Sequence, residues 1–288
     1  MIYLLLSILF TTTLMLIFKL FERFNINNFQ AIVFNYITAS CLCFFLVDTP
    51  ISISQIIEEP WFKSAFIIGV LFICCFNLIA FSAQKIGIAV TSVATKISLC
   101  IPITFGFIYY GDRITVLKIV GICLALFSIY FTSKKEGKQK ESKKNYILIP
   151  IILFVCTGLL DLIFIYSQES YEIVEKGLEL KFSAILFTIA GFIGVPILIV
   201  KFFCGHKIAL KNAIAGFVLG VPNVLSIVFF LKSLHHFPES TFVFPINNMG
   251  IVAASAIFAS ILFKEHLSKT NWLGIVIAML SILLISIS

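Results

Sequence analysis

Residues 134–167, KKEGKQKESKKNYILIPIILFVCTGLLDLIFIYS, contain the two kinds of segment that decide the fold of this chain. Residues 134–145 are polar and strongly basic, whereas residues 146–167 are apolar and carry a single charge, Asp161. About 20 consecutive apolar residues are enough to span a bilayer as an α-helix. The second segment therefore predicts a transmembrane helix. The first predicts a solvated linker, with a ligand-binding basic patch as the alternative.

The rest of the chain shares the apolar character of residues 146–167. Of its 288 residues, 60% are hydrophobic and 12% are charged, whereas a soluble domain carries about 25% charged residues. This composition excludes a soluble globular enzyme, a disordered chain and a disulfide scaffold. The formal charge of +7 fits basic loops that face anionic headgroups. It therefore predicts a lipid bilayer as a partner, and not nucleic acid.

The cysteines predict neither disulfides nor a metal site. Seven of the eight lie inside apolar runs, where a free thiol behaves as a small hydrophobe. Neither Cys41-x-Cys43 nor Cys74-Cys75 has histidines at ligand spacing. We therefore expect no metal, no other cofactor and no catalytic residues.

Ten apolar runs bounded by charges or turn residues predict ten membrane spans. All are expected to be α-helices, because a lipid-exposed backbone must satisfy its own hydrogen bonds. The third and fourth spans share only a short turn, at Lys85-Ile86-Gly87. The predicted spans are residues 2–20, 29–47, 61–84, 87–110, 114–132, 146–167, 181–200, 213–235, 239–263 and 270–287.

The basic linker divides these spans into two halves of five, and the halves share a spacing. The fourth span ends near Asp112, nine residues before Gly121, and the ninth ends near Glu265, nine residues before Gly274. Transporters built from repeats show weak internal symmetry of this kind. Because each half has an odd number of crossings, the second repeat must be inverted. The predicted fold is an all-α membrane protein of about ten transmembrane helices in two inverted five-helix repeats, with parts 1–133, 134–145 and 146–288.

This layout resembles the drug/metabolite transporter superfamily, and most closely its EamA-like type. The resemblance covers nearly the whole chain and rests on the ten helices, the two halves and the acid–glycine spacing. Two positions depart from the family pattern: Asp112 stands where glutamate is usual, and Trp272 near Gly274 has no counterpart beside Gly121. The resemblance implies a secondary transporter whose substrate path runs between the halves.

Lys96 and Asp161 are the sharpest functional candidates, because a charge at mid-span costs roughly 2.5–3.5 kcal/mol and usually faces a cavity or a partner. Lys96 lies in the middle of the fourth span, in a polar stripe that includes Ser92 and Thr95. It is expected to attract an anionic group or take part in proton coupling, with a structural ion pair as the alternative. Asp161 in the sixth span is the candidate partner, and it could instead bind and release a proton.

Asparagines in other spans extend the candidate site. A single asparagine predicts only an interhelical hydrogen bond, worth about 0.6 kcal/mol. As a set, the polar stripes on the third, fourth, eighth and ninth spans are expected to converge on one central cavity. The predicted substrate-binding residues are Lys96, Thr95, Ser92, Asn77, Asn223, Asn248 and Asn35.

Three of the prolines within the predicted spans are expected to kink their helices, because each removes an amide donor. Kinks at these positions would suit helices that bend during alternating access, and freed carbonyls could bind substrate. Static kinks repaired by serine or threonine hydroxyls are the alternative. The prolines are Pro102, Pro222 and Pro245, and the carbonyls that lose a donor are those of Ser98, Val218 and Thr241.

The orientation of the chain has two conflicting indications. Basic residues concentrate in the odd-numbered loops, and the positive-inside rule then places both termini outside. The family resemblance implies that both termini are inside.

Together these features predict a multi-pass protein of the cytoplasmic membrane that moves a small polar organic metabolite by alternating access, as a monomer or homodimer. The resemblance implies an amino acid or related compound as cargo and export as the direction. A proton or a counter-substrate is expected to supply the energy, because the sequence has no phosphate-binding loop motif. The alternative is a lipid-carrier flippase or a membrane enzyme with a laterally open cavity.

Overall fold

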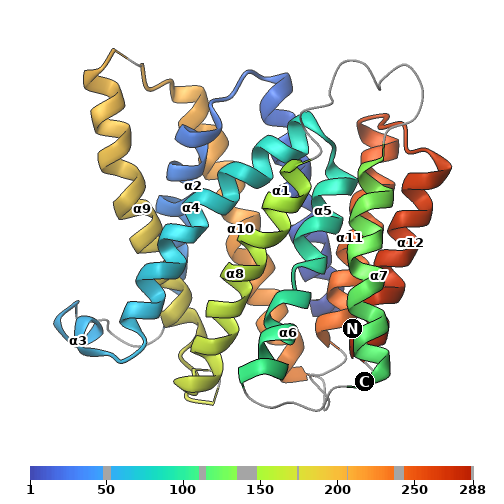
Figure 1. The fold of residues 1–288 in the computed structure, drawn as a ribbon. Helices are drawn as coiled ribbons and strands as arrows, with labels where there is room; N and C mark the ends of the chain where they lie inside the picture. Colours follow the sequence, from blue (N-terminus) through green and yellow to red (C-terminus); the bar gives the residue numbers. More distant parts are fainter. Residues whose placement is uncertain are drawn as a thin grey trace.

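A computed structural model of the chain describes residues 1–47, 53–109, 115–134, 148–173, 175–205, 207–236 and 243–286. In these ranges the protein forms a bundle of twelve α-helices, without β-strands (Figure 1). The helices are α1 Ile2–Arg23, α2 Asn28–Leu46, α3 Ile53–Glu58, α4 Phe62–Lys85, α5 Ile88–Ile97, α6 Cys100–Tyr109, α7 Val116–Ser133, α8 Leu148–Ser170, α9 Glu179–Phe203, α10 Leu210–His236, α11 Val243–Leu262 and α12 Lys269–Ser286.

The described residues contain ten helical segments that are long and apolar enough to cross a membrane, with α5 and α6 together forming one crossing of 22 residues. Each segment coincides with one of the ten predicted runs, which confirms the prediction of an all-α membrane protein. The short helix α3 was not predicted. Asp112 and the linker beyond Lys134 lie outside the described residues.

The fourth crossing is not the single helix that the sequence predicts. α5 ends at Ile97 and α6 begins at Cys100. Pro102 has no amide proton, so it cannot donate to the Ser98 carbonyl. That carbonyl accepts instead from the amide of Ile101 at 2.9 Å. The carbonyl that was expected to be free is therefore occupied within the turn, and the helix stops at this point.

The other two prolines leave their helices intact. α10 continues through Pro222. Pro245 is the third residue of α11, in the first turn, where helical amides have no carbonyl partner in any case. The kink expected at Pro245 is therefore absent from α11, and Thr241 lies outside the described residues.

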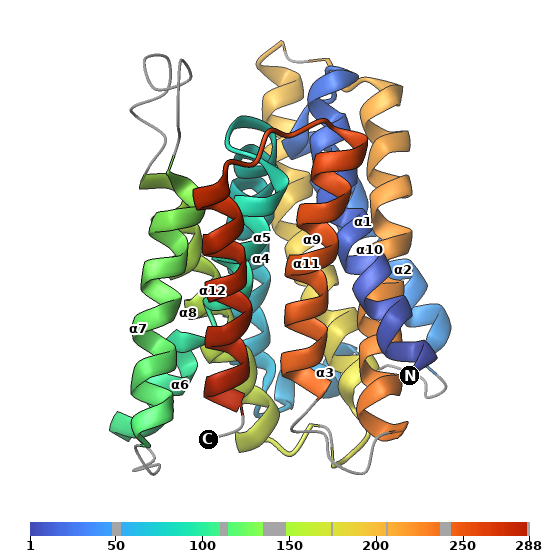
Figure 2. The same cartoon turned by 90° about the vertical axis from the view of Figure 1, so that its right-hand side faces the viewer.

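Helices of the two halves pack in a reciprocal pattern. α7 packs on α12, α2 on α9 and α5 on α11, so each of these contacts joins helices at the same place in the order of the two halves. Other contacts occur in matched pairs, with the roles of the halves exchanged. The contact of α1 with α10 matches that of α8 with α4, and the contact of α2 with α10 matches that of α9 with α4. Both views show α7 and α12 side by side (Figures 1 and 2).

At the α7–α12 contact the reciprocity extends to single residues. A Cβ added to Gly121 would lie 2.6 Å from the Ile285 side chain, and a Cβ added to Gly274 would lie 2.6 Å from the Thr132 amide nitrogen. The Ser281 hydroxyl donates to the Gly121 carbonyl at 2.7 Å. The two glycines of the repeated spacing thus allow the last helices of the two halves to meet closely.

Candidate functional site

The candidate site lies at the break between α5 and α6. α5 is a central helix that packs against α1, α4, α7, α8, α11 and α12. Nine of its ten residues are buried, and Lys96 in its last turn is the exception, being partly exposed. Apolar side chains would suffice for a helix this enclosed, so a lysine there indicates a role beyond packing.

Asp161 lies near the middle of α8, opposite the break. Its Oδ2 accepts a hydrogen bond of 2.8 Å from the Ser98 hydroxyl, which is also 2.7 Å from the Thr95 carbonyl. The Lys96 ammonium is close enough to interact electrostatically with the Asp161 carboxyl. The ion pairs found among the described residues nevertheless do not include Lys96. The predicted partner of Lys96 is therefore near it but is hydrogen-bonded to Ser98.

The helix ends at the break favour both charges. Lys96 is the last residue but one of α5, and the C-terminal end of a helix carries partial negative charge that favours a cation. Asp161 is hydrogen-bonded to Ser98, which lies two residues before the start of α6. The N-terminal end of a helix favours an anion. Discontinuous helices of this kind form substrate and ion sites in secondary transporters. The arrangement can therefore hold groups of either charge.

The two other predicted residues of α5 have different environments. The Thr95 hydroxyl donates to the Ser92 carbonyl at 3.0 Å, within its own helix. The Ser92 hydroxyl is fully buried and has no hydrogen-bond partner among the described residues. An unpaired buried polar group costs about 1–3 kcal/mol, so Ser92 is an available donor and acceptor beside the break.

Two predicted asparagines form a second polar group, between α2 and α10. The Asn223 side-chain amide donates to Asn35 Oδ1 at 3.2 Å, and both side chains are buried. Asn35 Nδ2 has no partner within the described part of the chain. No hydrogen bond among the described residues joins this pair to Lys96 or Asp161.

The remaining predicted asparagines lie apart from this pair. The Asn77 amide donates to the Ile73 carbonyl, one turn earlier in α4, at 2.8 Å. Asn248 is buried in the first half of α11. The structure thus brings Asn35 to Asn223 and Asp161 to Lys96, but it does not bond Asn77 or Asn248 to either group in the described ranges.

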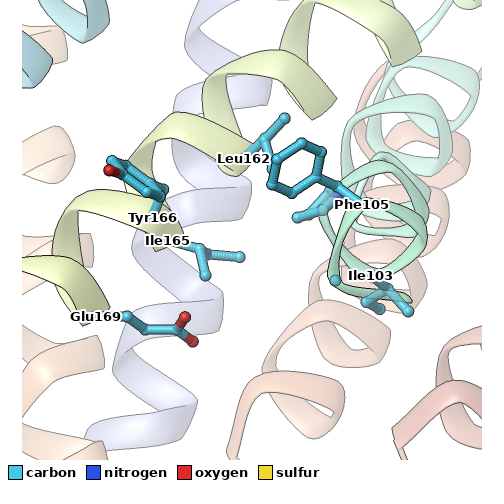
Figure 3. Close-up of a pocket in the computed structure, with 8 residues that line it drawn as sticks. Ile103, Phe105, Leu162, Ile165, Tyr166 and Glu169 are labelled. Carbon is cyan, nitrogen blue, oxygen red and sulfur yellow. The ribbon is translucent and has the colours of Figure 1, made fainter. Parts of the chain in front are cut away.

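A cavity of about 170 Å³ lies between α6 and α8 (Figure 3). Its lining is mainly apolar: Phe105 of α6 and Leu162 of α8 reach toward each other, and Glu169 provides a carboxylate on α8. The lining residues Pro102 and Ile165 follow Ser98 and Asp161 by one helical turn. The cavity therefore lies about one turn along α6 and α8 from the Ser98–Asp161 contact, which does not line it. It is lined by none of the predicted substrate-binding residues.

The chemistry of the site is hydrogen bonding and charge. The described residues contain no group of three or more His, Cys, Asp or Glu side chains placed to hold a metal ion. The eight cysteines all carry free thiols. Binding of a polar or charged molecule is the function that these groups can perform.

Two contacts were not predicted from the sequence. The first is the bond from Ser98 to Asp161, and the signal that could have identified it is the position of Ser98 one turn before Pro102. The second is the contact of Glu265 with the amide of Ile88, which lies 177 residues earlier in the chain. Periodicity and spacing carry no information about a contact over that separation.

Comparison with known proteins supports the family resemblance. Residues 1–134 match the sequence profile of the EamA-like transporter family. This match confirms the resemblance over the first half of the chain, and it is consistent with the drug/metabolite transporter superfamily. With its ten apolar spans, the protein is a multi-pass membrane protein whose first half is similar to transporters of this family.

Three relatives extend the comparison beyond this half. An uncharacterized protein of Haemophilus influenzae is 28% identical over 286 residues, which cover 96% of this chain and 94% of that protein. A protein of Bacillus cereus with the name "Putative sugar uptake protein" is 28% identical over 214 residues, covering 71% of this chain and 69% of that protein. A protein of Bacillus anthracis matches to the same extent.

Proposed function

We propose that this protein is a secondary transporter that carries a small polar organic metabolite across the cytoplasmic membrane by alternating access. The observation that carries the proposal is the pair of opposite charges, Lys96 and Asp161, at the break of a membrane-spanning helix. Each charge costs roughly 2.5–3.5 kcal/mol at the centre of a bilayer. The EamA match of the first half supports the same reading.

The two halves would act as inverted repeats, residues 1–133 and 146–288, joined by the linker 134–145. Support comes from the reciprocal packing of their helices and from the matched glycines Gly121 and Gly274. Rocking of one repeat against the other would open the site to one side of the membrane at a time.

Each predicted residue has a role in this mechanism. Lys96 would bind an anionic group of the substrate. Asp161 would bind a cationic group, or would exchange a proton and so couple transport to a proton gradient. Hydrogen bonds to the polar parts of the substrate would come from Ser92, Thr95, Asn35, Asn77, Asn223 and Asn248.

The opposite charges favour an amino acid or related zwitterion as substrate, because its carboxylate and ammonium match Lys96 and Asp161. A neutral sugar is the second candidate. It is supported by the name of the Bacillus relatives and by the amide pair Asn35–Asn223, since amides bind hydroxyl groups as both donor and acceptor. For the direction we propose export, on the family resemblance, while the relatives' name states uptake.

Transport by purified protein in liposomes tests this proposal. Labelled amino acids and sugars would be supplied on either side of the membrane, with and without a proton gradient. Lys96→Ala should reduce transport of the accepted compound by more than about tenfold, because its anionic group loses its counter-charge. Lys176→Ala, which removes an exposed lysine paired with Glu172, is the matched control. Wild-type transport by Lys96→Ala would contradict the proposed site.

The alternative is a lipid-carrier flippase or a membrane enzyme with a lateral opening. The observation that bears on it is the cavity between α6 and α8. Its volume of about 170 Å³ is below the roughly 300–1,000 Å³ of pockets that bind small molecules. A lipid headgroup would not fit there without further opening. Movement of labelled lipid between leaflets by the reconstituted protein would favour this alternative.

A further inference from the structure

The end of the bundle opposite both chain termini is joined by a contact between the two halves (Figures 1 and 2). Glu265 lies in the loop between α11 and α12, and both of its carboxylate oxygens are 3.1 Å from the amide nitrogen of Ile88, at the start of α5. Its Oε1 is also 3.8 Å from Lys19 Nζ, near the end of α1. One carboxylate of the second half thus contacts two helices of the first.

The start of α5 is shaped to receive this carboxylate. The first amides of a helix have no carbonyl partner within it, and the helix dipole favours an anion there. Gly87 has a φ of +133°, and a Cβ at this position would lie 2.9 Å from Glu265 Oε2. Glycine therefore allows the close approach. The loop that carries Glu265 is held to its own half: the Glu265 amide donates to the Ala259 carbonyl at 3.1 Å, near the end of α11.

Lys19 connects this contact to a polar group on α1 and α4. Its Nζ donates to the Gln84 carbonyl at 2.8 Å and lies 3.8 Å from Glu22, which pairs with Lys85 at 2.9 Å. These contacts all lie within the first half, so they can move with α1 and α4 as one body. The contacts of Glu265 cross between the halves, so separation of the halves at this end must break them.

We propose that Glu265 is a latch that holds this end of the transporter closed, and that its carboxylate releases the start of α5 whenever the end opens. The inference rests on the proposed alternating-access function. Glu265 is a positioning residue, because it acts through α5 and does not itself contact the substrate. Lys96 is eight residues beyond Ile88 on this helix, so release of Ile88 frees the helix that carries the mid-membrane charge.

Hydrogen–deuterium exchange of the full-length protein in lipid nanodiscs tests the latch without any substrate. In Glu265→Ala, the amides of residues 88–92 should exchange at least about tenfold faster than in the wild type, because local opening becomes easier. The α7–α12 contact should be unchanged. Glu265→Gln keeps an acceptor oxygen and loses the charge, so it should have an intermediate effect of about threefold. Glu172→Ala, at an exposed carboxylate near the opposite end, is the control and should match the wild type.

Glu265→Gln and a further variant, Gly87→Ala, keep the test decisive. Glu265→Gln preserves the shape of the side chain, so it reports on the latch if Glu265→Ala does not fold. Gly87→Ala, whose Cβ would displace the carboxylate, should also speed exchange in residues 88–92. Wild-type exchange there in the Glu265 variants would overturn the latch.

The liposome assay separates failure of the latch from failure of the proposed function. Faster exchange in the variants, together with no transport of any labelled compound by the wild type, would leave the latch standing and reject the transport proposal. Transport by the wild type with unchanged exchange in the variants would reject the latch alone.

Discussion

Two helix crossings near the middle of the membrane occupy equivalent places in the proposed repeats, yet they carry different chemistry. Where α5 meets α8, Lys96 lies near Asp161, and Ser98 is bonded to the carboxylate. The offset that relates the repeated glycines places Met249 and Ile8 at the corresponding positions, where α11 meets α1. One crossing is therefore charged and the other is apolar.

The apolar crossing shows what the fold itself requires. A Cβ on Gly250 of α11 would meet the Ile8 side chain, and a Cβ on Gly158 of α8 would meet Ile101. At α11–α1 and at α8–α6, a glycine of one helix thus admits an isoleucine of the other. Because packing of this kind suffices at α11–α1, the charges at α5–α8 are not needed to build the bundle. This comparison is the reason for assigning them to substrate or ion binding.

The largest effect is expected when the apolar crossing receives a charge. Met249→Lys should lower the free energy of unfolding by roughly 2.5–3.5 kcal/mol, because the equivalent partner position holds Ile8 and not a carboxylate. Adding Ile8→Asp should recover part of the loss. Thermal unfolding in detergent measures both, with Met249→Leu as the control. A Met249→Lys protein as stable as Met249→Leu would contradict the claim that this crossing does not accommodate a charge.

The next largest effect is expected from substitutions at the contact between α7 and α12, the last helices of the two halves. Gly274→Ala would place a Cβ 2.6 Å from the backbone nitrogen of Thr132, whereas Gly121→Ala would place it 2.6 Å from the flexible side chain of Ile285. Overpacking costs about 1–3 kcal/mol, and a backbone atom moves away from the added Cβ less easily than a flexible side chain does. The melting temperature should therefore fall more in Gly274→Ala. A larger fall in Gly121→Ala would contradict this geometry.

A smaller effect is expected at the centre of the charged crossing. Ser98→Ala removes the hydrogen bond to Asp161 and should lower the free energy of unfolding by about 1 kcal/mol. It should also slow transport, because the carboxylate loses its fixed position. Ser286→Ala, which removes only a bond to a carbonyl of its own helix, is the matched control. Identical melting and transport in the two variants would show that Ser98 does not serve the site.

The smallest effect is expected from a change of pH at the start of α5, where Glu265 contacts Ile88. Burial raises the pKa of Glu265 above its ordinary value, while the Ile88 amide and Lys19 act in the opposite direction. The closed contact therefore binds a proton more tightly than an exposed carboxyl does, so opening becomes easier as the carboxyl loses its proton; Glu22 and Lys85 are the other charges of this group. Exchange at the start of α5, corrected for the intrinsic effect of pH, should therefore rise as pH increases from about 5 to about 7.

Glu265→Gln is the control for this pH effect. It carries no titrating carboxyl at this position, so its corrected exchange should be flat over the same range. Corrected exchange in the wild type that falls with increasing pH would contradict the raised pKa of Glu265 in the closed contact.

The architecture was predictable because the length of an apolar run is a direct physical requirement of the bilayer. Each of the ten predicted runs coincides with a helical crossing. The break in the fourth crossing was not predictable, because a proline inside a run does not determine whether the helix stops. The helix breaks before Pro102 and continues through Pro222. The short α3 lacks the apolar length by which the spans were identified.

The candidate site was predictable only in part. The cost of a charge within a span identified Lys96 and Asp161 from the sequence. Their hydrogen-bond partners depend on how helices pack, and no pattern within one helix contains that information. Asp161 is bonded to Ser98 and Glu265 to the amide of Ile88, and these partners required the three-dimensional arrangement.

The most direct test of the central claim replaces the charged crossing by a copy of the apolar one. The double variant Lys96→Met, Asp161→Ile should melt at or above the wild-type temperature, because replacing buried opposite charges by apolar residues is often neutral or stabilising by about 1–4 kcal/mol. In liposomes it should not carry the metabolite that the wild type carries. A folded double variant that transports at the wild-type rate would contradict the claim that these two charges serve transport.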